Sequence, residues 1–346
     1  MFDLNAFKRR PDFENNLLKV LKKERPDRAT LCEPFISREK IVRFSGIACP
    51  GESDVDQLRV TVSAMERLGY DYASCYASSI RFSVESVDQK HTKSLNDDQG
   101  ICDWESFEKY AWPDMQSQDY SRLEKIAPYL PEGMKIVVLG PGGVLENIID
   151  LVGYDNLCFM LYDEPELAQA IFDSIGSRLV EYYDNAASFD TVGALVSNDD
   201  WGFNTQPFLS PDMMRKYLFP WHKKIVETIH KHGKPVILHS CGNYDSIIED
   251  VIEDMKYDAR HSYEDNIVPV EKAYEDLNGR LAIVGGIDLN FLATRTPEEV
   301  ERRARLMLER TWDRGGYALG SGNSIPDYVP DENYFAMLRA AHEFKG

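Results

Sequence analysis

The sequence predicts a (β/α)8 barrel, also called a TIM barrel, on two observations. Eight short apolar runs that read as strands are spread along the 346 residues, and most are followed by a segment with helical periodicity. Polar side chains capable of chemistry stand where the strands end, and in a barrel those ends converge on one mouth. A doubly wound sheet is the alternative arrangement of the same elements. We expect a single barrel domain over residues 1–346.

The strands are expected at short apolar runs bounded by turn residues. They are residues 29–33, 72–76, 135–139, 192–197, 236–238, 258–263, 281–284 and 317–319. The helices are expected where apolar residues recur every three or four positions. They lie near residues 53–68, 145–152, 165–183, 210–229, 247–255, 296–308 and 331–344. Strands that alternate with helices in this way indicate a parallel sheet.

Two segments lie outside this alternation. Residues 1–27 read as a helical extension, because the apolar residues from Phe13 to Leu21 fall on one stripe. Residues 77–130 form a long insertion after the second strand, in which residues 81–87 alternate like a strand of a surface hairpin. Insertions of this length usually carry function, often as a lid, so we expect this one at the barrel mouth.

Local signals mark several element ends. Thr296-Pro297-Glu298-Glu299 is a capping box with proline at the first helical position. Pro220 stands inside the helix that Ser210 begins, which predicts a kink. Gly140-Pro141-Gly142-Gly143 resembles a phosphate loop only superficially, because it lacks both the P-loop lysine and the G-x-G-x-x-G spacing. We therefore expect a tight turn there.

The composition narrows the class of protein. A hydrophobic content of 43% and a charged content of 28% are typical of a globular protein in water. No apolar run approaches the length of a membrane span, and no apolar signal segment opens the chain, so we expect a cytoplasmic protein without a membrane partner. The net charge of -19 argues against a nucleic-acid partner, because phosphate binding needs concentrated Lys and Arg. The six cysteines lack framework spacing and fit reduced thiols.

The strongest candidate for chemistry is His239-Ser240-Cys241, at the end of the fifth strand. Residues two apart on an extended chain face the same way, so an imidazole and a thiolate can supply two ligands of a Zn²⁺ site. The alternative is a buried cysteine beside a histidine whose hydrogen bonds are satisfied. A catalytic zinc site needs a third protein ligand, for which we favour Glu264. The other candidates for that ligand are His261, Glu33 and Asn323.

Further polar residues are expected at the mouth. Asp199 and Asp200 could hold a substrate, supply a proton or coordinate a metal through their carboxylates, or Asp200 could simply satisfy backbone donors in an acidic loop. The residues expected to bind substrate are Tyr76, Asn198, Trp201, Gly286, Asp288 and Asn323. The three histidines along one helix are instead expected at its surface and C-terminal end. They are His222, His230 and His232.

The chain resembles the uroporphyrinogen decarboxylase superfamily over nearly its whole length. The resemblance is most specific in five motifs that follow strands or begin helices. They are Asp200-x-Gly202, Leu209-Ser210-Pro211, His232-Gly233-Lys234-Pro235, Leu238-His239-Ser240-Cys241-Gly242 and Gly320-Ser321-Gly322-Asn323-Ser324-Ile325-Pro326. The superfamily has a (β/α)8 barrel, as the strand count also predicts.

Two kinds of enzyme in the superfamily differ in their motifs. The decarboxylases carry an arginine-rich Met-Arg-Gln-Ala-Gly-Arg segment that grips porphyrinogen carboxylates, whereas this chain has Cys32-Glu33-Pro34-Phe35. The corrinoid methyltransferases carry a zinc-binding His-x-Cys, which His239-Ser240-Cys241 matches, and a later Cys, in whose place this chain has Gly322-Asn323. A site with one sulfur is a harder Lewis acid, suited to an ether or phenolate oxygen.

The resemblance therefore implies a zinc-dependent methyltransferase that moves a methyl group from a small methylated donor, such as a methoxylated aromatic, to a corrinoid protein. As a hypothesis, the zinc polarises the donor heteroatom while Co(I) attacks the methyl carbon, and the insertion shapes the surface on which the corrinoid protein docks. One alternative is a metal-free carboxy-lyase like uroporphyrinogen decarboxylase. Another is a non-catalytic protein that binds a corrinoid or tetrapyrrole.

Overall fold

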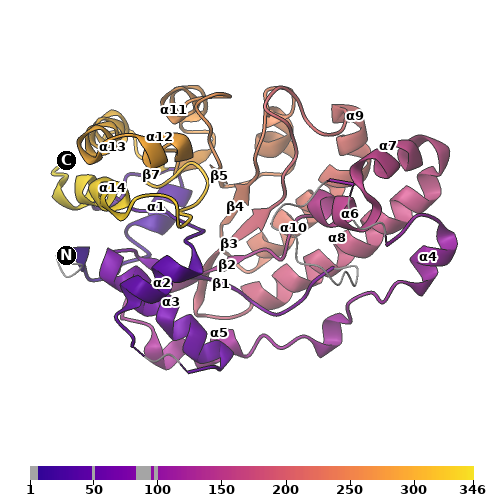
Figure 1. Ribbon diagram of the computed structural model, residues 1–346, viewed down its shortest axis with the longest axis horizontal. Helices are drawn as coiled ribbons and strands as arrows, with labels where there is room; N and C mark the ends of the chain where they lie inside the picture. Colours follow the sequence, from indigo (N-terminus) through magenta and orange to yellow (C-terminus); the bar gives the residue numbers. More distant parts are fainter. Residues whose placement is uncertain (1–6, 49–50, 83–94, 97–99) are drawn as a thin grey trace.

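The computed structural model describes residues 7–48, 51–82, 95–96 and 100–346. Its centre is a curled sheet of parallel strands in the order β1-β2-β3-β4-β5-β6-β7, surrounded by helices (Figure 1). The strands are β1 (Tyr72–Tyr76), β2 (Lys135–Leu139), β3 (Val192–Asn198), β4 (Val236–His239), β5 (Ala259–His261), β6 (Ala282–Val284) and β7 (Tyr317–Ala318). Seven of the eight predicted strands are thus confirmed, with ends that differ by two residues at most.

The predicted strand over residues 29–33 is reduced to one bridge, between Leu31 and Leu319. On its other side, the segment contacts β1 through one tyrosine side chain. The Glu33 backbone N–H donates to the Tyr72 hydroxyl at 2.6 Å. The N–H that would begin a ladder with β1 is thus taken by a side chain, and Pro34 has no N–H to extend the pairing with the chain after β7. The sheet is therefore TIM-barrel-like and not closed, and the prediction of eight complete strands was wrong in this detail.

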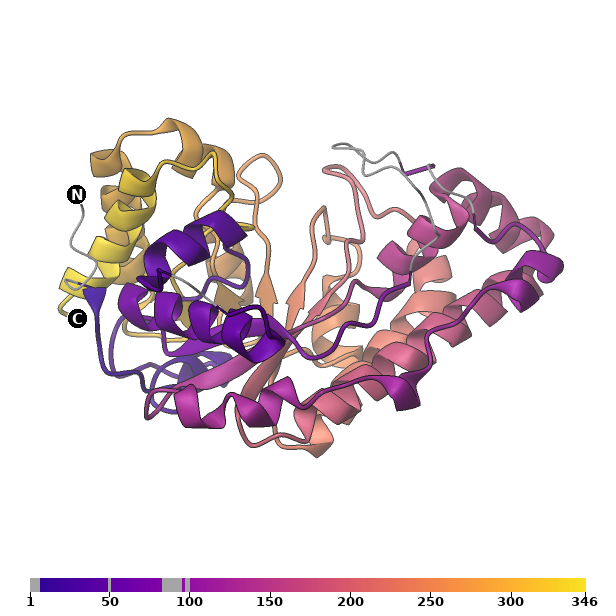
Figure 2. The ribbon, with the colours of Figure 1, turned by 60° about the horizontal axis from the view of Figure 1, so that its bottom comes forward.

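Helices cover the outside of the curled sheet (Figure 2). They are α1 (Leu17–Leu21), α2 (Arg38–Ser45), α3 (Asp54–Leu68), α4 (Trp104–Lys109), α5 (Arg122–Lys125), α6 (Val144–Val152), α7 (Tyr154–Asp163), α8 (Pro165–Ala187), α9 (Pro211–Met213), α10 (Phe219–Lys231), α11 (Val270–Leu277), α12 (Leu289–Thr294), α13 (Pro297–Thr311) and α14 (Asp331–Glu343). Short 3-10 turns lie at Met115–Ser117 and Ala127–Tyr129, and π-helical turns at Met214–Leu218 and Asp250–Asp254. In the part of the chain that is described, no helix combines the length and apolar character of a membrane span.

Two helical predictions need correction, and a third is confirmed. The N-terminal extension is helical only over Leu17–Leu21, although the predicted stripe from Phe13 to Leu21 is buried. Pro220 does not kink a helix interior: it lies in the first turn of α10, where its missing N–H is not needed, and the irregular π turn precedes it. The capping box at Thr296 is confirmed, with proline in the first turn of α13.

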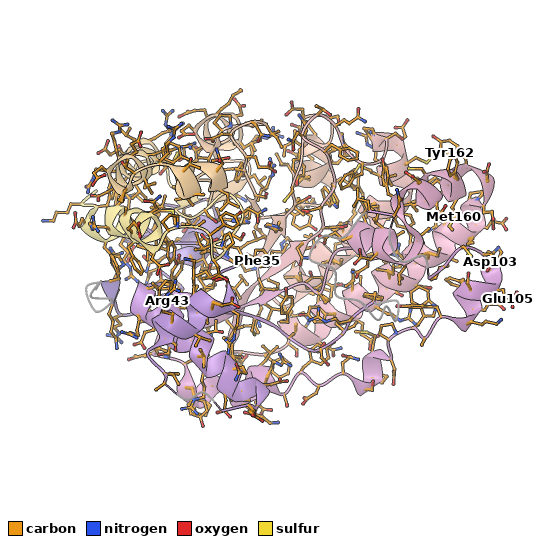
Figure 3. All side chains as sticks on the ribbon, in the orientation of Figure 1. Phe35, Arg43, Asp103, Glu105, Met160 and Tyr162 are labelled. Carbon is orange, nitrogen blue, oxygen red and sulfur yellow. The ribbon has the colours of Figure 1, made fainter. Side chains whose placement is uncertain are left out.

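The insertion leaves the end of β1 at Ala77, and its described residues 100–130 lie against the helical layer. Its extended chain runs beside α8, where the Arg178 guanidinium donates to the Pro113 carbonyl at 3.0 Å (Figure 2). Asp103 and Glu105, which flank the first turn of α4, stand at the outer edge of the molecule (Figure 3). The expected hairpin strand falls mostly on residues 83–87, outside the described residues.

Candidate metal centre

Asp200, His239 and Cys241 bring one donor atom each to within 4.8 Å of one another. His239 ends β4 and pairs in register with Asn198 at the end of β3, so the loop after β3 begins beside it. A backbone hydrogen bond from the Cys241 N–H to Asp200 Oδ1, at 2.8 Å, joins the two loops. The three side chains therefore come from neighbouring strand ends, where a barrel concentrates its chemistry.

A glycine makes this approach possible. Gly242 has φ +102°, a left-handed conformation that other residues rarely adopt. A Cβ at this position would lie 2.4 Å from the Gly202 carbonyl oxygen. The turn after Cys241 can therefore pack directly on the chain that follows Asp200.

The Cys241 thiol has two polar neighbours. Its Sγ lies 3.3 Å from Ser262 Oγ, and the Asn323 side-chain amide donates to it at 3.3 Å. Burial, with the Asp200 charge second, raises the pKa of the thiol to about 12. A bound divalent cation would oppose both effects, because the thiolate is the form that binds metal. The two nearby donors would then stabilise the sulfur's negative charge.

A second histidine, His261, orients the His239 ring. Its Nδ1 lies 2.7 Å from His261 Nδ1, and the two rings stack at 4.9 Å between centroids. Burial lowers the pKa of His239 to about 4, so the ring is neutral at pH 7. When His239 Nδ1–H is the donor in this pair, Nε2 keeps its lone pair for a metal. His261, a candidate third ligand in the sequence, is thus a support of His239.

The third ligand is the main difference from the sequence prediction. Among the described residues, the group of donor atoms contains Asp200 and neither Glu264 nor Glu33. Glu264 is half-buried on a pocket of about 860 Å³. Glu33 is fully buried, and its two carboxylate oxygens accept from the N–H and hydroxyl of Ser321. The Asp200 carboxylate, which the sequence offered as a possible metal ligand in the loop after β3, lies in the donor group instead.

One sulfur, one nitrogen and one carboxylate oxygen make a donor set that fits Zn²⁺. The side chains lie close enough to share one ion, and the imidazole is in its neutral form. His239 is also oriented through its second nitrogen, as metal-bound histidines usually are. The residues present therefore fit the metal that the sequence suggested.

Asp199 is fully buried and faces away from this group. Its carboxylate accepts from the N–H groups of Leu145 and Glu146, at 3.0 and 2.9 Å, in the first turn of α6. His222 Nε2 lies 2.8 Å from the same carboxylate. The expectation that His222 lies on the surface was wrong: it is fully buried, and its Nδ1 lies 2.7 Å from the Tyr257 hydroxyl.

The loop from Gly140 to Gly143 is the tight turn that was predicted, with φ +83° at Gly142. A Cβ at Gly143 would lie 2.1 Å from the Asp199 side chain. Glycine is therefore required here for the buried carboxylate to reach α6. This packing accounts for the loop without a phosphate ligand.

Glu146 is a candidate that the sequence reading missed. Its Oε2 accepts from the Gly143 N–H at 2.8 Å and from Asn198 Nδ2 at 3.3 Å. Burial, then the charges of Asp199 and Asp200, raise the pKa of its carboxyl to about 8. The sequence signal was a glutamate three residues after a glycine that ends a strand loop, which reads as an ordinary helix cap.

The residues predicted to bind substrate have different surroundings. Tyr76 is 40% exposed at the end of β1 and lines a pocket of about 470 Å³ with Phe35, which Figure 3 shows near the centre of the molecule. Trp201 is only 1% exposed, so its indole is part of the wall behind the site. A Cβ at Gly286 would lie 2.2 Å from the Val270 side chain, so packing explains this glycine.

Asp288 and Asn323 lie at the edge of the larger pocket. Both Asp288 oxygens accept backbone N–H groups, from Asp265 at 3.0 Å and Phe291 at 2.9 Å, which makes Asp288 the N-cap of α12. Asn323 instead joins this pocket to the Cys241 thiol. Of the two, Asn323 is therefore the one in contact with the candidate metal group.

Residues 131–344, more than half of the chain, match the uroporphyrinogen decarboxylase (URO-D) family. The chain is 28% identical over 188 residues to a uroporphyrinogen decarboxylase of Geobacter sulfurreducens, a match that covers 54% of this chain and 52% of the relative. It is 24% identical over 308 residues to a uroporphyrinogen decarboxylase of Anaeromyxobacter sp., which covers 83% and 84%. The chain spans about half the length of several curated relatives that it matches.

Among solved structures, the chain is similar to a methyltransferase from Methanosarcina mazei, with a TM-score of 0.72 and 19% identity. The match covers 96% of this chain and 99% of the other. At this identity, the likeness supports the fold.

Proposed function

The chain belongs to the uroporphyrinogen decarboxylase family, and we propose that it is a zinc-dependent methyltransferase. It would move a methyl group from a small methylated donor to a corrinoid protein. The observation that carries the proposal is the group of Asp200, His239 and Cys241, whose donor atoms lie within 4.8 Å of one another. Decarboxylation of a porphyrinogen would have no evident use for an imidazole and a thiol arranged in this way.

Zinc held here would act as a Lewis acid toward the heteroatom that carries the methyl group. The chain's own residues would hold the donor set in place. His261 fixes the His239 ring, Asn323 donates to the Cys241 sulfur, and the Cys241 N–H fixes Asp200. Ser262 Oγ, 3.3 Å from the sulfur, could donate to it once it is a thiolate. Each proposed ligand therefore has a hydrogen bond that orients it, which is a common feature of metal sites.

The apolar part of the donor would lie beside Phe35. The Phe35 ring meets the His239 ring edge-on, with 4.9 Å between centroids, and also lines the pocket of about 470 Å³ that contains Tyr76. Ile36, Ile41 and Leu58 add apolar surface to that pocket. These contacts support a methoxylated aromatic as the donor, because its ring would pack on apolar and aromatic side chains.

The second candidate is a carboxy-lyase, and the names of the curated relatives favour it. A porphyrinogen with several carboxylates needs unpaired cations. Around the smaller pocket, Arg122 is paired with Asp54, whereas Arg38 is hydrogen-bonded to the neutral Gln57 and keeps its charge. Of the two arginines that line this pocket, Arg38 alone has no carboxylate partner among the described residues, which is fewer cations than a substrate with several carboxylates needs.

Metal analysis of the purified protein tests the proposal. We expect about one zinc per chain in the wild type purified without chelators, and loss of that zinc in His239→Ala and Cys241→Ala. Glu264→Gln is the matched control, because the change is in a nearby carboxylate outside the donor group, and it should retain zinc. A wild type without zinc would refute the proposed mechanism.

Demethylation assays then identify the reaction. Methoxylated aromatics are supplied with a reduced corrinoid protein, and the released phenol and the methylated corrinoid are measured. Decarboxylation of a porphyrinogen by the metal-free protein would establish the second candidate. Purified protein that carries a coloured tetrapyrrole but turns over neither substrate would instead indicate a binding protein.

A further inference from the structure

We propose that Glu146 is the proton donor to the oxygen from which the methyl group leaves. The inference rests on the proposed function, since it assigns a role in methyl transfer from an ether. It is carried by the position of the Glu146 carboxyl, which stands beside the strand end that presents His239.

The backbone fixes that position. The carboxyl is hydrogen-bonded to Asn198, and Asn198 is the register partner of His239 at the β3–β4 edge. Asp200, two residues after Asn198, is close enough to affect the Glu146 carboxyl electrostatically. Glu146 therefore borders the candidate metal group without belonging to it.

The hydrogen bonds of the carboxyl distinguish its two oxygens. The bonds from the Gly143 N–H and from Asn198 Nδ2 both end on Oε2, at 2.8 and 3.3 Å. Oε1 is the oxygen left to carry a transferable proton. A glutamate that only capped α6 would need no more than the first of these bonds.

The charged and titratable groups that face this carboxyl favour its protonated form. Asp199 and Asp200 approach it from the loop after β3, Tyr76 from β1, and Tyr183 from α8. Burial is the first cause that raises its pKa to about 8, and the charges of Asp199 and Asp200 follow. An acid with a pKa near the working pH is suited to general acid catalysis.

The Asn198 side chain is held in place beside Glu146 by packing. Its Oδ1 is buried, and a Cβ built on Gly140 would lie 2.5 Å from it. Its amide therefore has little freedom to turn away from the Glu146 carboxyl.

The step balances in atoms and electrons. The C–O bond of the ether breaks, and its electron pair stays on the oxygen, while the methyl carbon bonds to the electron pair of the reduced corrinoid on the partner protein. The Glu146 Oε1–H bond breaks in the same step, and its proton passes to the oxygen as negative charge develops there. The product is an alcohol or phenol, and the Glu146 carboxylate regains a proton from solvent.

Glu146→Gln tests this role with little structural change, because the amide oxygen can still accept from the Gly143 N–H. Glu299→Gln is the matched control. Glu299 is the corresponding glutamate of the α13 capping box and accepts from the Thr296 N–H at 3.0 Å, far along the chain from the site. Both variants should retain the wild-type zinc content.

We expect kcat for an unactivated aryl methyl ether to fall by about 100-fold or more in Glu146→Gln and to stay unchanged in Glu299→Gln. The defect should shrink with methyl ethers of more acidic phenols, whose oxygens leave without a proton. Wild-type activity should fall as pH rises through about 8, and Glu146→Gln should lack that decline.

The outcomes separate the two proposals. An active, zinc-containing wild type together with a Glu146→Gln variant as fast as Glu299→Gln would overturn the role of Glu146 alone. A wild-type rate that stays constant from pH 7 to above 9 would do the same, even if Glu146→Gln failed to fold. A wild type that neither binds zinc nor demethylates any ether would overturn the proposed function, and this inference with it.

Discussion

Replacing Asp199 with alanine should destabilise the protein far more than the loss of an ordinary helix cap. The Asp199 carboxylate is fully buried and accepts from the N–H groups of Leu145 and Glu146, at 3.0 and 2.9 Å. It also lies 2.8 Å from His222 Nε2, on a ring that is itself buried. Asp199→Ala would leave all three of these groups without a partner.

The size of the effect follows from these contacts. Each buried donor left without a partner costs about 1–3 kcal/mol. With about 1 kcal/mol for each amide and about 2 kcal/mol for His222, we expect the free energy of unfolding to fall by about 4 kcal/mol. This is a large share of the roughly 5–15 kcal/mol that stabilises a typical domain.

Urea unfolding followed by tryptophan fluorescence measures the change. Thr296→Ala is the control, because Thr296 caps α13 at the surface through a single bond from the Glu299 N–H at 3.3 Å. Loss of such a cap costs about 1 kcal/mol. If Asp199→Ala were no less stable than Thr296→Ala, the buried carboxylate would not be holding β3, α6 and α10 together as argued.

Three further predictions concern single positions. Burial raises the pKa of Glu33 from 4.5 to about 8, so the folded protein favours the protonated carboxyl. The free energy of unfolding of the wild type should therefore fall as pH rises from about 5 to 8, and Glu33→Gln should lack this decline in urea titrations. Gly143→Ala should lower the free energy of unfolding by more than about 2 kcal/mol, because the new Cβ would lie 2.1 Å from Asp199. Gly233→Ala, whose Cβ would meet open space, should lower it by about 1 kcal/mol in the same assay. Asp200→Asn should weaken zinc binding by more than the roughly 10- to 100-fold that loss of an outer-shell partner costs, measured in competition with a chromophoric chelator, and unchanged affinity would remove Asp200 from the ligands.

Local patterns in the sequence were enough to predict most of the fold. Apolar runs such as Lys135–Leu139 and Tyr72–Tyr76 are strands with those same ends, because burial of the run and a turn after it are local properties. The strand expected at residues 29–33 did not form a ladder, and the reason lies outside the run itself. Its outer N–H at Glu33 is taken by a tyrosine hydroxyl from β1, a contact across 39 residues.

The candidate site was predictable where one strand end carried it, as with His239 and Cys241. It was less predictable where residues meet from different strands. Asp200 joins the group only because β3 and β4 pair in register, and His222 is buried only because α10 packs against the loop after β3. The sequence offered the Asp200 carboxylate as one possible metal ligand, but no spacing along the chain singles it out over Glu264 or predicts that His222 is buried.

Asn323 bears on what kind of methyl donor the site would favour. The sequence has Asn323 where the resemblance led us to look for a second cysteine, and in the structure its amide donates to Cys241 Sγ at 3.3 Å. The amide can stabilise a single thiolate, but it adds no second sulfur to the donor set. A metal with one sulfur, one nitrogen and one carboxylate ligand is harder than one with two thiolates, and it should prefer oxygen over sulfur in its open position. The same substitution that separates this chain from a thiol-activating site thus supports an ether as the methyl donor, and an ether oxygen is also the leaving group that needs the proton proposed for Glu146.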